Sequence, residues 1–198
     1  MLKLILVCLL AYLAGSVNFA VLFFKLAGRD DPRSRFSGNA GTTNVYRQAG
    51  LLWAVLVFAL DIARAVAVAV AARYYITTDG GWLVWTVFFL ILGNSFPCFH
   101  GFRGGKGVAS YLGFTALIVP WAALLAAMVW VLVYGVIRVP FVASFFMVAV
   151  LSIGHALSFQ WAPAATAAAV ATFTLIVFNH RINIRQYRKD GRFPAQEQ

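Results

Sequence analysis

The sequence predicts an all-α protein, a polytopic membrane helix bundle of about seven transmembrane helices. Of its 198 residues, 62% are hydrophobic and only 11% are charged, and the apolar residues gather in long runs. A soluble domain averages about half apolar and about a quarter charged residues. Because this apolar excess cannot be hidden in one aqueous core, lipid must be part of the solvent. We therefore expect a single integral membrane domain over residues 1–198, with the lipid bilayer as a partner.

Seven apolar runs are candidate membrane crossings, because about 20 apolar residues of helix span the hydrocarbon core. They are residues 3–26, 50–72, 82–99, 107–119, 121–137, 141–158 and 162–180. The first run exceeds the roughly 7–15 apolar residues of a secretory signal peptide, so we interpret it as a retained helix. The stretch 107–137 has two interpretations: one long helix kinked at Pro120, or a hairpin of two short helices that turns there.

The basic residues favour the hairpin and set the orientation of the chain. Cytoplasmic loops of membrane proteins carry an excess of Lys and Arg, and the segment 25–47 holds five of them. With seven crossings, this segment, the turn with Arg103 and Lys106, and the basic tail all fall on the cytoplasmic side. Only Lys3 and Arg73 remain outside. We predict that the N-terminus lies outside and the C-terminus inside.

The formal net charge of +10 indicates anionic ligands rather than nucleic acid, because the Lys and Arg residues form short segments and no long hydrophilic arm. The two cysteines, Cys8 and Cys98, lack CxxC spacing and fall near opposite membrane faces in this topology. We expect no disulfide, no metal site and no cofactor.

Three predicted cytoplasmic segments are unlike ordinary connections. The first, Gly28–Gly50, reads GRDDPRSRFSGNAGTTNVYRQAG and contains Ser37, Asn44 and Arg47. Its many hydroxyl and amide side chains directly precede an apolar helix. At membrane depth, such polar groups are tolerated only if they are buried in protein or line a wet cavity. The alternative is a solvated loop with ordinary topogenic charges.

The second segment, Gly101–Gly107, reads GFRGGKG and precedes a predicted helix. Free backbone amides at a helix N-terminus bind anions, and Lys106 adds a point charge. The segment does not satisfy GxxxxGK[ST], so nucleotide hydrolysis is not expected. The alternative is a flexible turn with two topogenic charges.

The third segment, Asn179–Arg188, places His180 and Asn183 on one helical face. His180 is a candidate proton acceptor, a candidate hydrogen-bond donor to a phosphate, or merely a polar interfacial residue. Asp61 and Arg64, three apart inside an apolar run, are expected to form a structural ion pair rather than to bind substrate. We expect His100 to be interfacial and His155 to be hydrogen-bonded between helices. The three segments together suggest phosphorylated substrates, handled by an enzyme or by a transporter.

The three segments resemble the motifs of the bacterial acyl-phosphate:glycerol-3-phosphate acyltransferase family (PlsY). The first motif is matched by Gly15-Ser16, Lys25, Asp31-Pro32-Arg33 and SGNAGTTNVYRQAG from Ser37. The second is matched by FPCFHGFRGGKGVAS from Phe96, and the third by HRINI from His180. Asn94 stands where the family usually has His, Asp61-Ile-Ala-Arg64-Ala65 replaces its DxxKG, and the usual third-motif Glu is absent. RVPFVAS retains Arg138 and Ser144 of the pattern.

The resemblance implies a multi-pass enzyme of the bacterial cytoplasmic (inner) membrane. It would transfer a fatty acyl group from acyl phosphate to the 1-hydroxyl of glycerol 3-phosphate, giving lysophosphatidic acid and phosphate. No HxxxxD motif is present, since Gly105, Gln160 and Arg185 follow the three histidines at the fifth position. The expected catalytic residues are Ser37, His180 and Asn183, and the expected substrate-binding residues are Arg47, Asn44, Lys106, Gly101, Gly104, Gly105, Gly107 and Ser144.

Overall fold

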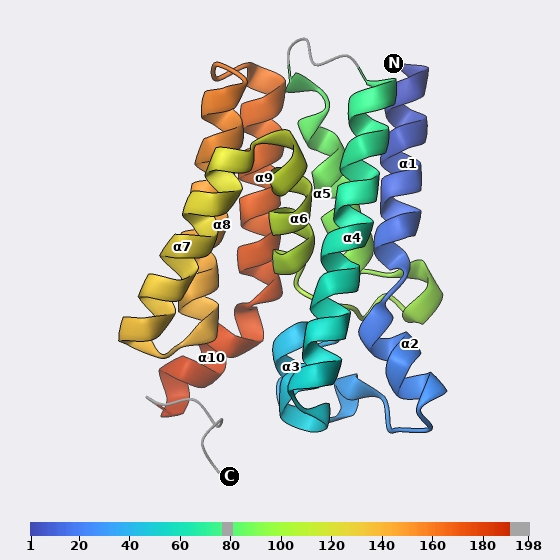
Figure 1. The fold of residues 1–198 in the computed structure, drawn as a ribbon, viewed down its shortest axis with the longest axis vertical. Helices are drawn as coiled ribbons and strands as arrows, with labels where there is room; N and C mark the ends of the chain where they lie inside the picture. Colours follow the sequence, from blue (N-terminus) through green and yellow to red (C-terminus); the bar gives the residue numbers. More distant parts are fainter. Residues whose placement is uncertain (77–80, 191–198) are drawn as a thin grey trace.

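The computed structural model describes residues 1–76 and 81–190, which form a bundle of helices with no strand among them (Figure 1). The α-helices are α1 (Leu2–Ser16), α2 (Phe19–Leu26), α3 (Thr42–Ala49), α4 (Leu51–Tyr75), α5 (Val84–Ser95), α6 (Val108–Ile118), α7 (Pro120–Ile137), α8 (Pro140–Ser158), α9 (Pro163–Asn179) and α10 (Arg181–Asp190). Two 3₁₀ turns, η1 (Pro32–Ser34) and η3 (Cys98–His100), lie in the loops. The predicted all-α membrane fold is confirmed.

Each of the seven apolar runs contains a helix, but the helices differ in length. Within the described residues, four segments are long and apolar enough to cross a membrane, namely Leu2–Leu26, Leu51–Tyr75, Pro120–Ile137 and Pro140–Ser158. Helix α9 together with α10, bent by 47°, would make a fifth. Helix α5 has 12 residues and α6 has 11, so each is about half as long as the hydrocarbon core is thick. The number of crossings and the orientation therefore stay predictions.

The stretch 107–137 is a hairpin, so the single kinked helix is the wrong alternative. In Figure 1, α6 rises through the bundle and α7 descends beside it. The chain turns at Val119, whose N–H donates to the Thr115 carbonyl at 2.7 Å. Pro120 then begins α7, where its missing N–H leaves no hydrogen bond unmade. The basic residues had favoured this alternative.

Glycines let α1 and α5 pack with their backbones in contact. A Cβ at Gly15 would lie 2.1 Å from the Leu90 carbonyl oxygen, and a Cβ at Gly93 would lie 2.0 Å from that of Tyr12. Only glycine permits such an approach between membrane helices. This contact fixes the lower end of α1 beside the lower end of α5, which is where the polar segments begin.

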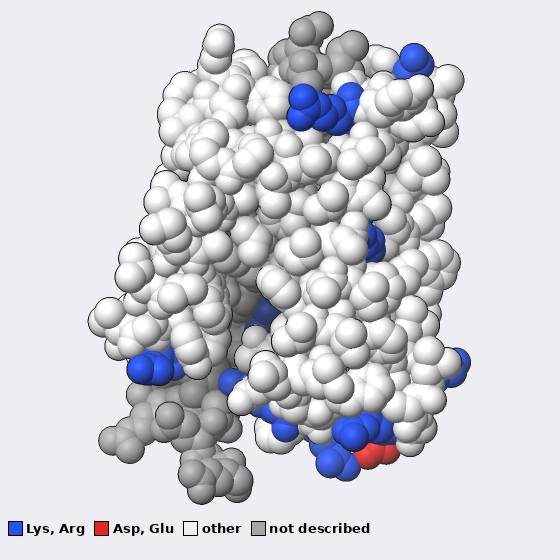
Figure 2. All heavy atoms as spheres, viewed as in Figure 1, with Lys and Arg blue, Asp and Glu red and all other residues white. Residues whose placement is uncertain are grey.

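The polar segments gather at the lower end of the bundle in Figure 1, where η1, α3 and α10 lie. Figure 2 shows the Lys and Arg side chains concentrated at this end, around a deep hollow between α7 and α4. Cys8 and Cys98 are both free thiols, as predicted.

Candidate functional site

The hollow is a cavity of about 380 Å³ that the three polar segments and the helices α4, α6, α7 and α8 enclose. The three segments supply the polar part of its lining, which we call the polar end, and side chains such as Phe58, Leu112 and Val131 supply the apolar part, which we call the apolar end. Most of the predicted site residues line it: Ser37, Asn44, Arg47, Gly105, Lys106, Gly107, Ser144, His180 and Asn183. Gly101 and Gly104 lie outside its lining.

The first segment forms α3 and the loop before it. Asn44 is buried, and its Nδ2 donates to the carbonyl oxygens of Pro32 at 2.7 Å and Asn39 at 2.9 Å. The side chain therefore holds the loop in shape. Thr42 and Thr43 form the first turn of α3 and line the cavity, and the N–H groups of a first turn have no intrahelical partner. The sequence analysis did not single out this helix N-terminus.

Arg47 lies one turn further along α3, half-buried and facing the cavity. Burial lowers the pKa of Arg47, but a guanidinium stays charged at neutral pH. A guanidinium can offer two parallel N–H donors to one phosphate.

The second segment needs its glycines for packing, which corrects the expectation that all of its amides are free. The Gly104 N–H donates to the Ser95 carbonyl at 3.1 Å, and the Gly105 N–H to the Asn94 carbonyl at 2.8 Å. A Cβ at Gly104 would lie 2.0 Å from the Asn94 carbonyl oxygen. Gly107 has φ +86° and caps α6. The N–H groups in the first turn of α6, which follows the segment, have no intrahelical partner.

Lys106 joins the second segment to the third. Its Nζ donates to Asn183 Oδ1, and burial, followed by the charge of Arg47, lowers the pKa of Lys106 to about 8. The positive charges of Lys106 and Arg47 therefore repel each other at the polar end. An anion placed there would relieve this repulsion and restore the full charge of the ammonium group.

His180 lies at the bend between α9 and α10 and is 3% exposed. Its Nδ1 is 2.8 Å from the Ile176 carbonyl oxygen. Because a carbonyl only accepts, Nδ1 carries the proton and donates. Nε2 is then the nitrogen that can accept a proton or, when protonated, donate to a phosphate.

Ser144 lies on α8 and lines the cavity. Its Oγ donates to the Pro140 carbonyl at 2.9 Å and accepts from Trp130 Nε1 at 3.3 Å. The hydroxyl therefore already has partners within the protein, and it fixes the indole of Trp130 against the cavity. Ser37, by contrast, lies in the loop before α3 and faces the polar end.

The predicted pair of Asp61 and Arg64 is present, with Arg64 Nη2 3.0 Å from Asp61 Oδ1. Asp61 also lines the cavity, together with Asn94 and Ser110. The sequence analysis did not assign Asn94 and Ser110 to the site. The predicted interhelical bond of His155 is confirmed, since its Nε2 lies 3.0 Å from Thr115 Oγ1.

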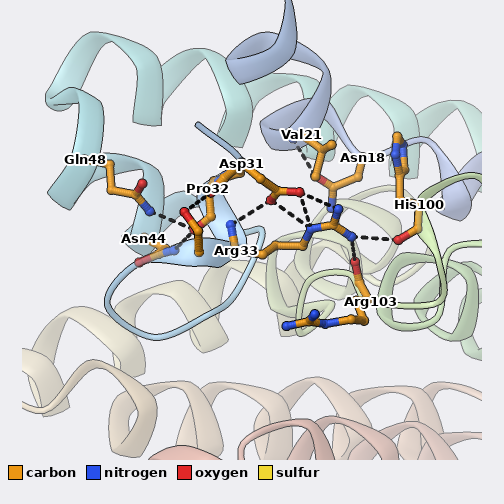
Figure 3. A network of polar contacts seen from close by, with 10 residues as sticks. Asn18, Val21, Asp31, Pro32, Arg33, Asn44, Gln48, His100 and Arg103 are labelled. Atoms are coloured by element: carbon orange, nitrogen blue, oxygen red, sulfur yellow. Dashed lines mark hydrogen bonds and ion pairs between the residues drawn. The ribbon is translucent and has the colours of Figure 1, made fainter. Parts of the chain in front are cut away.

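Arg33 connects the first and second segments, as Figure 3 shows. Its Nη1 donates to the carbonyl oxygens of His100 at 2.7 Å and Arg103 at 2.6 Å. Asp31 accepts from Arg33 Nε at 2.9 Å, and this bond lowers the pKa of the Asp31 carboxyl. The motif residues Asp31 and Arg33 thus act as a latch between two loops, on the outer side of the polar end.

The fold and the cavity define an integral membrane protein with a site for substrates that carry both phosphate and an apolar chain. Cationic side chains and apolar helix walls line the same cavity, and α4, α7 and α8 among these helices are long and apolar enough to cross a membrane.

The chain belongs to the glycerol-3-phosphate acyltransferase family, whose family model matches residues 5–190. It is 36% identical over 178 residues to a glycerol-3-phosphate acyltransferase of an Anaeromyxobacter species, covering 88% of each chain. It is 37% identical over 180 residues to the Pseudomonas fluorescens enzyme of the same name, covering 91% of this chain and 93% of that one.

Two solved structures of PlsY (YgiH), an integral membrane glycerol 3-phosphate acyltransferase, have the same fold. The glycerol 3-phosphate form superposes with a TM-score of 0.87 at 33% identity, covering 96% of this chain and 94% of that one. The lysophosphatidic acid form gives 0.84 at 32% identity, covering 96% and 93%. The predicted family and the class of membrane acyltransferase are confirmed, and the transporter interpretation is not supported.

Proposed function

We propose that the protein transfers a fatty acyl group from acyl phosphate to the 1-hydroxyl of glycerol 3-phosphate. The products are lysophosphatidic acid and inorganic phosphate, and no cofactor takes part. The observation that carries the proposal is one cavity with Arg47, Lys106 and His180 at its polar end and apolar helix walls beyond. This distribution suits two phosphates side by side and one acyl chain.

The polar end would hold the phosphates. Arg47 and Lys106 supply the positive charge, and the first turns of α3 and α6 supply N–H groups. Ser37 and Asn183, which also line the cavity, add short polar contacts. Gly101 and Gly104 act indirectly, by shaping the loop that presents Lys106. We assign the same indirect role to Asn44.

The reaction is an acyl transfer from an activated mixed anhydride. The 1-hydroxyl oxygen of glycerol 3-phosphate attacks the acyl carbonyl carbon, and the bond from that carbon to the phosphate oxygen breaks. Phosphate leaves with the electron pair, and Lys106 and Arg47 stabilise its charge. The hydroxyl proton passes to His180 Nε2 or to a substrate phosphate. Because the leaving group is good, positioning and charge neutralisation are the main tasks of the protein.

The acyl chain would lie along the apolar end, between α4, α6 and α7. Trp130, held by Ser144, and Val131 form one wall of this part. We place the polar end at the cytoplasmic face of the bacterial inner membrane, with the N-terminus outside, because the basic residues gather there. One domain over residues 1–198 carries the whole site.

The experiment is incubation of the purified protein with palmitoyl phosphate and glycerol 3-phosphate. We expect equimolar phosphate release and lysophosphatidic acid formation. Palmitoyl-coenzyme A serves as the comparison donor and should give no product. Activity only with the coenzyme A ester would contradict the assigned donor. Uptake of glycerol 3-phosphate into sealed vesicles without any product would contradict the assigned reaction.

His180→Ala separates the two possible proton acceptors. A general base contributes about 10²–10⁴-fold in rate, so loss of turnover on that scale with unchanged substrate binding supports His180. Near-normal turnover would assign the proton to a substrate phosphate. His155→Ala is the matched control, because His155 is buried between helices and does not line the cavity.

A further inference from the structure

Arg64 pairs with Asp61, but it also makes hydrogen bonds to residues around the substrate cavity that this ion pair does not need. It lies in the middle of α4 and is 9% exposed. Its Nη1 donates to the Val17 carbonyl and approaches that of Gly15 at 3.5 Å. Its Nη2 donates to Ser110 Oγ at 2.9 Å and to Asn94 Oδ1 at 3.1 Å.

The contacts of Nη1 explain how the first membrane span can be interrupted. Between α1 and α2, Val17 and Asn18 leave the helical conformation. The last carbonyl groups of α1 then lack intrahelical partners, which is costly inside a bilayer. Arg64 supplies donors to two of these carbonyls, and its guanidinium stacks over the Phe19 ring at 5.4 Å. Arg64 thus stabilises the break.

The break leads to the first phosphate segment. Asn18 is 3% exposed, and its Nδ2 donates to the Ala40 carbonyl at 3.2 Å while its Oδ1 caps α2. Ala40 lies between Ser37 and the first turn of α3. Arg64, through Val17 and Asn18, therefore fixes the loop that carries Ser37 into the cavity.

The contacts of Nη2 lead to the second phosphate segment. The carbonyl of Asn94 accepts from the Gly105 N–H at 2.8 Å, next to Lys106. A Cβ at Gly105 would lie 2.8 Å from Asn94 Nδ2, so the Asn94 side chain also packs on this loop. Ser110 belongs to the first turn of α6, the other anion-binding terminus. Asn94, Gly105 and Ser110 all line the cavity.

We propose that Arg64 is a positioning residue that holds both phosphate-binding segments in register, one through Asn18 and the other through Asn94 and Ser110. It acts through these residues and not on the substrates. Asp61 balances its charge. The proposal rests on the acyl transfer proposed above.

The first test is Arg64→Lys, which keeps the charge beside Asp61 but replaces a two-nitrogen fork by one nitrogen. We expect KM to rise for both substrates, with kcat/KM down by about 10²-fold, because misplacing reacting groups by about 1 Å has effects of this size. A merely structural role would lower the active fraction and leave KM unchanged. The control is Tyr111→Phe, on the same helix as Ser110. It removes a buried hydrogen bond of 3.1 Å between Tyr111 and Ser152, and it should keep the normal KM.

The two branches are tested with Asn18→Ala and Asn94→Ala, which also serve if Arg64→Lys fails to fold. Each should raise KM, and Arg64→Lys should have a smaller effect in the Asn94→Ala background than alone. Fully additive effects, or normal KM in both single variants, would overturn the proposal.

Hydrogen exchange gives a readout that does not depend on activity. In Arg64→Lys, amides of residues 37–41 and 101–107 should exchange faster, while those of α8 and α9 should not change. Unchanged exchange in both segments would refute the positioning role. If the wild-type protein proved inactive in the acyl-transfer assay, but Arg64→Lys still accelerated exchange in these two segments, the proposed reaction would be refuted. The positioning role of Arg64 would stand.

Discussion

The two ends of the cavity are built in opposite ways. At the polar end, side chains on loops and short helices are held by partners from other segments, as Lys106 is by Asn183 and Arg33 by the His100 carbonyl. At the apolar end, the helices α4, α6 and α7 form the walls, and only 17% of α7 is buried inside the protein. Single polar contacts therefore set the reaction geometry, whereas the chain-binding wall is a lipid-facing surface. We expect substitutions to have large effects at the polar end and small ones at the apolar end.

Lys106→Ala should have the largest effect. It removes the ammonium group that lies beside Asn183 and near Arg47, so both phosphate binding and stabilisation of the leaving phosphate are lost. We expect kcat/KM to fall by about 10²–10³-fold, as when a preorganised donor to a developing anion is removed. Steady-state kinetics with each substrate varied in turn measures this.

The matched control is Lys25→Ala, which makes the same charge change on the last turn of α2, outside the cavity. It should retain kcat/KM within about twofold, the range of surface substitutions. Equal activity of Lys106→Ala and the wild type would mean that the phosphates bind elsewhere.

The lowered pKa of Lys106, about 8, predicts a pH dependence at the polar end. Below pH 8 the ammonium is charged and binds phosphate. As the pH rises through 8, the free enzyme loses this charge, so KM rises and kcat/KM falls. Lys106→Arg should move this limb to higher pH, because a guanidinium keeps its proton. A pH–rate profile between about 6 and 10 compares the two proteins, and an identical alkaline limb in both would assign it to another group.

The sequence was sufficient for those features that depend on local pattern. The apolar runs predicted the helices, and the distribution of basic residues chose the hairpin at Pro120, which the structure contains. The three polar segments were recognised from their residue types, and the structure brings Ser37, Lys106 and His180 to one cavity. Charge and hydropathy act locally, so a single sequence reveals them.

The sequence was insufficient where a role depends on contacts across the fold. Asn44 was predicted as a substrate ligand, and the sequence did not reveal that its Nδ2 holds the Pro32 and Asn39 carbonyls. Gly104 and Gly105 looked like donors of free amides, but both N–H groups are used by residues 94–95. The reach of Arg64 to Val17 and Ser110 depends on how three helices cross, which no spacing in the sequence reveals.

Arg33→Gln should have an intermediate effect, because Arg33 supports the polar end from its exposed side. The variant loses the bonds to the His100 and Arg103 carbonyls but leaves the Arg64 contacts intact. Exposed charged contacts contribute about 0–1 kcal/mol, so we expect KM to rise by about three- to fivefold with kcat nearly unchanged. Arg35→Gln is the control, since Arg35 pairs only with Asp30 among the described ion pairs. A loss as large as that of Arg64→Lys would show that the exposed latch matters as much as the buried contacts.

Ala127→Phe should have the smallest effect and should change preference rather than rate. Ala127 lines the apolar end on α7, and a phenyl ring there occupies space that a long acyl chain would use. Because α7 is largely lipid-facing, the acyl chain can bend sideways into the bilayer. The loss of kcat/KM should therefore be smaller than in a closed pocket, where one methylene changes kcat/KM by about tenfold or more. We expect the ratio of kcat/KM for palmitoyl over octanoyl phosphate to fall by about threefold, below that closed-pocket range.

Leu124→Phe, exposed on the same helix but outside the cavity, should leave the ratio unchanged. A loss of activity with both donors equally would contradict the separation of the two ends, because it would mean that the wall of α7 also sets the geometry of the phosphates.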